Sequence, residues 1–234
     1  SDIEFYLFVE DAAYQLFDLP NWIGNIAPVL ESFENEFGTT VALFANLVRG
    51  EFHACPASTM PQVRNWAGNV WVNDPDSMII LDRTGELREH VSSLIGEAPD
   101  RSTPENIALL CRRFLDWMIF GTNVLRRGEH ARALEILWFI QRHLLWMVRI
   151  VERSTEHFPT PSKNLERDIT PEAYQRYATC TGTLDADSLG RAYAESWSWG
   201  KELMATLTMT WGAPEPKDTI GKLDDRLKKW GLRQ

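Results

Sequence analysis

The chain has 234 residues, of which 44% are apolar and 24% charged, the balance of an ordinary globular protein with one large domain or two small ones. Its formal charge of -9 argues against a protein that coats nucleic acid, because such proteins carry a basic surface. The charge does not argue against binding of a nucleotide, because a metal ion can screen the phosphates. The apolar runs are too short to cross a bilayer, and the three scattered cysteines have neither metal-ligand nor disulfide spacing. We therefore expect a cytoplasmic protein that binds neither nucleic acid nor a membrane.

Residues 2–9 alternate in polarity, which predicts a strand with one buried face. The residues expected on the buried face are Ile3, Phe5, Leu7 and Val9. Asp2 and Glu4 then share the opposite face, roughly 6.5 Å apart along the strand. Two carboxylates at this spacing repel each other unless a cation or water screens them, so the segment fits either a solvated acidic face or a cation site.

A helix and a second strand are expected next along the chain. The turn at Asp18–Asn21 precedes apolar residues whose helical spacing continues to Leu30. Residues 39–48 form an apolar run of strand-forming residues, and Arg49–Gly50 is predicted to form a tight turn after it.

The segment after this turn contains a third acid. Residues 51–55 alternate again, so Glu51 and His53 are expected to share one face of a further strand. Residues 76–83 are predicted to form a short apolar strand, and a helix is expected to begin at Thr84.

The second part of the chain is expected to be helical. Residues 96–104 have the composition of a linker, and long stretches with helical periodicity follow it. The expected helix starts are Thr103, Ala131, Thr170 and Asp185, with a last amphipathic helix around Ile220–Trp230. We therefore predict an α+β fold, with a mixed β-sheet domain in residues 1–98 followed by an α-helical bundle in residues 99–234.

The three acids meet if the strand of Glu51 lies beside the first strand, which the sequence alone leaves as an assumption. Asp2, Glu4 and Glu51 would then face one point, where three carboxylates bind a hard divalent cation such as Mg²⁺. Two such ions about 3.5–4 Å apart are a common arrangement for phosphoryl displacement. The alternative for Glu51 is a solvated residue that follows a turn.

Several stretches of the chain resemble a known family. SDIEFY at residues 1–6, LVRGEFH at 47–53 and MIILDRTGEL at 78–87 resemble the lincosamide nucleotidyltransferases, antibiotic-resistance members of the DNA polymerase β-like nucleotidyltransferase superfamily. The likeness continues into the helical part with LRRGEHARALEIL at residues 125–137. It covers nearly the whole chain.

The resemblance implies an activity and roles for the three acids. Members of the family transfer the adenylyl group of ATP to a hydroxyl of a lincosamide-type antibiotic and release pyrophosphate. Asp2 and Glu4 match the paired acids that hold Mg²⁺, of which two ions are expected, and Glu51 matches the third carboxylate, which also acts as general base. Residues 1–98 would be the catalytic domain and residues 99–234 would bind the antibiotic acceptor. Family members can form homodimers.

One departure from the family concerns phosphate binding. The family has a Gly-Ser motif shortly before its paired acids, and no Gly-Ser dipeptide occurs in the 234 residues. Because the chain starts with Ser1 inside a predicted strand, we expect residues that precede it to be missing from this sequence. The first alternative is a non-catalytic nucleotidyltransferase-like interaction domain that lacks this motif. The second is a hydrolase, such as a glycosidase, with a pair of catalytic carboxylates.

Four further residues are candidates for contacts to the nucleotide or the substrate. Each also has an ordinary structural explanation: Arg49 as a solvated turn residue and His53 as a strand histidine in a packed environment. Arg83 fits a local ion pair with Glu86, and Arg127 lies at a helix C-terminus, where the helix dipole favours a cation.

Overall fold

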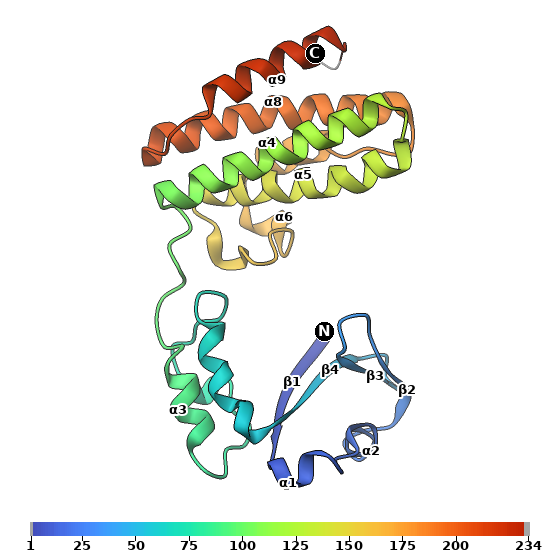
Figure 1. Ribbon diagram of the computed structural model, residues 1–234, viewed down its shortest axis with the longest axis vertical. Helices are drawn as coiled ribbons and strands as arrows, with labels where there is room; N and C mark the ends of the chain where they lie inside the picture. The colour runs from blue at the N-terminus through green and yellow to red at the C-terminus, as the bar shows by residue number, and fades with distance from the viewer. Residues whose placement is uncertain (1, 232–234) are drawn as a thin grey trace. The chain divides into compact units, whose positions relative to one another are not determined.

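The structure is a computed structural model that describes residues 2–231, with the side chain of Asp2 outside the described part. The chain divides into two compact units, Ser1–Ala98 and Pro99–Gln234 (Figure 1). The first contains the sheet and the second is helical, so the predicted α+β class is confirmed. None of the helices described within residues 2–231 combines the length and the apolar composition that a membrane-spanning helix needs.

The first unit is built around one mixed sheet. Its elements are β1 (Asp2–Val9), α1 (Asp11–Tyr14), α2 (Leu19–Gly24), β2 (Val29–Glu34), β3 (Thr40–Phe44), β4 (Arg49–Pro56), the 3-10 helices η1 (Ala57–Trp66) and η2 (Pro75–Ser77), and α3 (Glu86–Ser92). The strand order is β1-β4-β3-β2, with β1 parallel to β4 and the other neighbours antiparallel. The first strand and the strand of Glu51 are therefore neighbours.

One face of this sheet is apolar because the side chains of a strand alternate between faces. Phe5 of β1 and Phe52 of β4 are Cα partners, and their rings stack with centroids 5.6 Å apart. Ile23 of α2 covers Phe52 on this side, and both residues are almost completely buried. The polar residues of β1 and β4 are consequently left on the other face.

Three expectations for the first unit are wrong. Arg49–Gly50 is not a turn but the start of β4, because the chain reverses earlier, at Leu47, where φ is 62°. The predicted helix ends at Gly24, and Val29 starts a strand instead. Residues 76–83 do not form a strand.

Local hydrogen bonds explain the missing strand at residues 76–83. Asp74 caps η2, and the Asp82 carboxylate accepts hydrogen bonds from the backbone N–H groups of Arg88 and Gly85 at 2.8 and 2.9 Å. The bond from Arg88 is the main reason why the pKa of Asp82 is lowered. Such side-chain bonds compete with strand pairing and hold the segment as an irregular loop before α3.

The second unit is a helical bundle. Its elements are α4 (Pro104–Arg126), α5 (His130–Val151), η3 (Thr155–His157), α6 (Leu165–Asp168), α7 (Pro171–Thr179), α8 (Ala186–Trp211) and α9 (Lys217–Lys229). Thr103, Thr170 and Asp185 cap α4, α7 and α8, which begin where the sequence predicts. The long helices α4, α5 and α8 lie side by side and enclose one apolar core (Figure 1).

Gly200 allows α4 and α8 to approach closely. A Cβ added at Gly200 would lie 2.1 Å from Cζ of Phe114, whose buried ring stacks on Trp197 with centroids 6.5 Å apart. We expect Gly200→Ala to lower the free energy of unfolding by about 1–3 kcal/mol, because the ring has no free space to move into.

Urea unfolding of the intact protein measures this effect, with Gly221→Ala as the matched control. Gly221 lies in α9 and has nothing within 4 Å of an added Cβ. Alanine is the better helix former, so the control should be stabilised by about 0.5–1 kcal/mol. Equal changes in both variants would contradict the close approach at Gly200.

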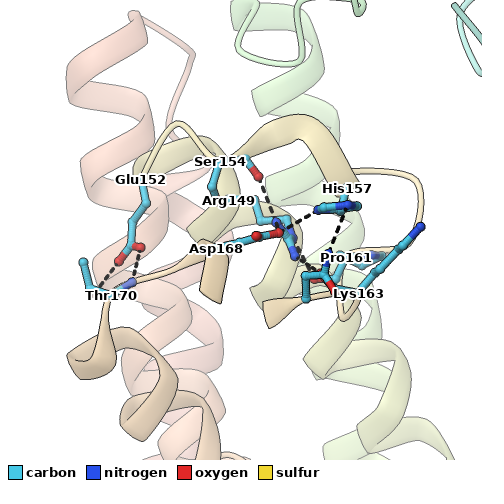
Figure 2. A network of polar contacts seen from close by, with 9 residues as sticks. Arg149, Glu152, Ser154, His157, Pro161, Lys163, Asp168 and Thr170 are labelled. Carbon is cyan, nitrogen blue, oxygen red and sulfur yellow. Dashed lines mark hydrogen bonds and ion pairs between the residues drawn. The ribbon is translucent and has the colours of Figure 1, made fainter. Parts of the chain in front are cut away.

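Arg149 organises the connection that follows α5. Its guanidinium is completely buried and donates to the carbonyls of Pro161, Ser154 and Lys163 at 2.7, 2.9 and 2.6 Å (Figure 2). It also donates to Oδ2 of Asp168 at 2.9 Å. One side chain thereby satisfies backbone acceptors along the irregular segment that connects α5 to α6.

Candidate active site

The register between β1 and β4 gathers polar side chains on one face of the sheet. Glu4 is the Cα partner of Glu51, and Asp2 is the partner of Arg49. Partners in neighbouring strands point to the same face. We call this side the acid face and define it by Glu4, Tyr6, Arg49, Glu51 and His53. The backbone of Asp2 has the same register, but its side chain lies outside the described residues.

Tyr6 lies within the electric field of both carboxylates. Burial is the main cause that raises the pKa of Tyr6, and the negative charge of Glu4 is the second, with Glu51 also contributing. The phenol therefore stays protonated at neutral pH and can donate a hydrogen bond on the acid face.

Glu51 is held by two neighbours. Arg49 donates from Nη2 to Oε1 of Glu51 at 2.6 Å, and Asn35 donates from Nδ2 to the same oxygen at 3.3 Å. Asn35 is itself fixed, because its Oδ1 accepts from the backbone N–H groups of Phe37 and Thr39, both at 3.0 Å. The carboxylate is 28% exposed, so its direction is set while one side remains open to a ligand.

Glu4 lies beside His53. Nε2 of His53 is 3.3 Å from Oε1 of Glu4, although this contact lacks hydrogen-bond geometry and Nε2 has no hydrogen-bond partner within residues 2–231. The ring of Tyr6 stacks on the imidazole, with centroids 4.2 Å apart and planes 5° apart. The imidazole of His53 is thus held on one face by the ring of Tyr6, and its Nε2 edge points toward the carboxylate of Glu4.

The acid face carries two described carboxylates, Glu4 and Glu51. Glu4 and Glu51 offer carboxylate oxygens from neighbouring strands, and such cations prefer oxygen ligands. Among the described residues, no group of three or more His, Cys, Asp or Glu could hold a metal ion. The third carboxylate of the predicted set, Asp2, is not among the side chains described.

Comparison with known proteins identifies the family. Residues 103–226, more than half of the chain, match the model of the lincosamide nucleotidyltransferase-like C-terminal domain. This chain belongs to that family. The predicted resemblance to lincosamide nucleotidyltransferases is thereby confirmed, and the match lies entirely within the helical unit.

A solved structure extends the comparison to the sheet. The crystal structure of an aminoglycoside 6-adenyltransferase from Bacillus subtilis superimposes with a TM-score of 0.51 and 12% sequence identity, covering 98% of this chain and 87% of that chain. At this identity the likeness shows a shared fold. A search of the curated proteins found no match.

The two remaining predicted residues of this lincosamide nucleotidyltransferase-like chain belong to other elements. Arg83 is exposed on the loop before α3, and no contact joins it to the acid face in the described part of the chain. Arg127 is the C-cap residue that follows α4 in the helical unit, and it forms an ion pair with Glu129. The structure thus brings Glu4, Glu51, Arg49 and His53 together and does not bring Arg83 to them.

Sequence reasoning missed Tyr6 of the acid face and Asn35, which binds Glu51 from outside the defined set. Tyr6 is separated from His53 in the chain but stacks on it, and its place next to Glu4 on the same strand face was the available signal. Asn35 follows β2 in the turn before Gly38, and nothing in that turn indicates that its amide reaches Glu51.

Proposed function

We propose that this protein is an adenylyltransferase that transfers the adenylyl group of ATP to a hydroxyl of a lincosamide-type antibiotic. The observation that carries the proposal is the parallel register that pairs Glu4 with Glu51 on one face. The family match supports it from the other unit of the chain.

We propose Glu51 as the general base. It accepts the proton of the acceptor hydroxyl, whose oxygen forms a bond to the α-phosphorus of ATP while the bond between that phosphorus and the oxygen leading to the β-phosphorus breaks. Pyrophosphate leaves with the electron pair of that bond. Arg49 and Asn35 support this role because they orient the Glu51 carboxylate.

Asp2, Glu4 and Glu51 are the residues that would hold Mg²⁺, with two ions as the expected number. When bound, the metal neutralises phosphate charge and makes the attacking hydroxyl more acidic. His53 and Arg49 lie on the same face and are proposed to contact the nucleotide or the acceptor. Arg83 and Arg127 remain predictions for substrate contacts.

The two units have different proposed roles. The sheet unit, residues 1–98, would be the catalytic domain because it carries the acid face. The helical unit, residues 99–234, would bind the antibiotic acceptor, in keeping with its match to the lincosamide nucleotidyltransferase-like domain.

Incubation of the intact protein with ATP, Mg²⁺ and a panel of lincosamide and aminoglycoside antibiotics tests the proposal. Mass spectrometry should find a lincosamide that has gained one AMP unit, with release of pyrophosphate. EDTA should abolish the gain, and added Mg²⁺ should restore it, because the phosphates need a divalent cation.

Three results would contradict parts of the proposal. Modification of aminoglycosides alone would show that the acceptor class is wrong. Unchanged transfer in EDTA would exclude a role for the divalent cation. Binding of ATP without transfer to any acceptor would favour the non-catalytic interaction domain.

A further inference from the structure

A hollow of about 330 Å³ lies in the sheet unit beside the acid face. The residues that matter for its chemistry are Glu4, Tyr6, Asn65, Trp66, Asn69 and Met78. They come from β1, from the end of η1 and from the loops that follow η1 and η2. We call it the Trp66 hollow.

Aromatic and apolar groups form the walls of the Trp66 hollow. The ring of Tyr6 lies against His53 and also meets the ring of Trp66, with centroids 4.7 Å apart and planes tilted by 55°. Trp66 packs against a small buried cluster that contains Val63 and Val91, so its indole is anchored. Tyr6 and Met78 are 41% and 42% exposed, which leaves apolar surface available to a ligand.

Two carboxamides supply polar groups at the same place. The side chains of Asn65 and Asn69 are exposed and make no hydrogen bond to another residue within the described range 2–231. The backbone N–H of Asn69 donates to the carbonyl of Trp66 at 2.9 Å, which fixes the turn that carries it. Each carboxamide has an N–H donor next to a C=O acceptor. It can therefore form two hydrogen bonds with the edge of a heterocycle that carries an acceptor next to a donor.

The position of Glu4 relates the hollow to the proposed chemistry. Glu4 lines the hollow and also belongs to the acid face, so a ligand in the hollow extends directly to the proposed site of the metal and phosphates. A flat group with apolar faces and polar edges fits these walls better than a polyhydroxylated sugar, whose many hydroxyls need more partners than two amides and one carboxylate.

We propose that the Trp66 hollow holds the nucleobase of the nucleotide co-substrate, stacked on its aromatic walls and contacted at its edge by Asn65 and Asn69. This inference rests on the proposed function, because it places the base relative to the phosphates on the acid face. It adds a binding role for Tyr6, Trp66 and the two asparagines.

Binding of ATP and of inorganic tripolyphosphate, each with Mg²⁺, to the intact protein separates base contacts from phosphate contacts. Calorimetry should find ATP bound more tightly than tripolyphosphate. Trp66→Leu should lower the affinity for ATP by roughly ten- to a hundred-fold, the usual range for the loss of one aromatic stacking partner, and leave the affinity for tripolyphosphate unchanged. Trp138→Leu is the matched control, because Trp138 is an exposed tryptophan of α5, and it should change neither affinity.

A second pair of variants keeps the test independent of the packing around Trp66. Asn69→Ala should weaken ATP binding and leave the affinity for tripolyphosphate unchanged. Asn73→Ala, at an exposed asparagine that does not line the hollow, should change neither affinity.

Equal affinity of the unchanged protein for ATP and tripolyphosphate would overturn the base site while leaving the proposed transferase activity standing. So would a rise in KM for the antibiotic, with ATP binding unchanged, in Trp66→Leu and Asn69→Ala. If neither ATP nor tripolyphosphate binds, the proposed function fails together with the base site.

Discussion

Glu51→Gln is expected to reduce adenylyl transfer by roughly 10²–10⁴-fold, the contribution of a positioned general base. The glutamine keeps an oxygen that can accept from Arg49 and Asn35, so the local arrangement of β4 should persist. What it loses is the negative charge, which serves both proton removal and cation binding. The loss should therefore appear in kcat, with a higher Mg²⁺ concentration needed for half-maximal rate.

Pyrophosphate release in the presence of the antibiotic measures this effect, and thermal unfolding followed by circular dichroism checks that the fold is retained. Glu34→Gln is the matched control, because Glu34 is exposed on β2 and its partner Thr40 pairs with Phe52, whose side chain lies on the apolar face of the sheet. Glu4→Gln should resemble Glu51→Gln in both readouts. A Glu51→Gln protein that releases pyrophosphate at the unchanged rate would falsify the assignment of this residue.

The acid face could be predicted from the sequence except for one assumption, that the strand of Glu51 lies beside the first strand. The alternation of residues 2–9 and 51–55 identifies which side chains share a face within each strand, because side-chain direction in a strand has a fixed period of two. It cannot identify which strands are neighbours. The structure pairs β1 with β4 in parallel, and Glu4 and Glu51 then meet because the register aligns them.

The parts that the sequence did not predict depend on contacts between residues distant in the chain, or on side-chain hydrogen bonds that compete with strand pairing. MIIL at residues 78–81 has the composition of a strand, but the bonds that Asp82 accepts from the backbone hold this segment in a loop. The Trp66 hollow depends on a ring in η1 that meets Tyr6 of β1, a contact across about sixty residues of chain that periodicity does not encode. In the helical unit the capping residues are local signals, which is why those helix starts were predictable.

Arg149→Ala is expected to lower the free energy of unfolding of the helical unit by about 3–5 kcal/mol, because a completely buried side chain that makes four hydrogen bonds is removed. Figure 2 shows why the loss is large: the guanidinium bonds three backbone carbonyls and Asp168 at once. Without it, the carbonyl of Pro161 and its neighbours lose their donor, and the buried volume of the side chain becomes a cavity. Arg149→Lys should recover only part of the loss, because an ammonium group cannot reproduce the planar fork of donors.

Urea unfolding at neutral pH measures the loss, and Arg112→Ala, an exposed arginine of α4, should stay within about 0.5 kcal/mol of the unchanged protein. An Arg149→Ala variant as stable as Arg112→Ala would contradict a structural role for the guanidinium.

The pH dependence of stability provides an independent test of the same network. The hydrogen bond with His157 is the main cause that lowers the pKa of Asp168, and the bond from Arg149 is the second. A carboxyl group with a lowered pKa stabilises the folded state above the pKa of the unfolded chain, about 3.9, and this stabilisation is lost as the pH falls through the folded pKa. Arg149→Ala brings the pKa of Asp168 closer to its ordinary value, so the difference in stability between the two proteins should shrink as the pH falls below about 4. A difference that stays constant from pH 7 to the acid range would mean that Arg149 acts through the carbonyls alone, without its bond to Asp168.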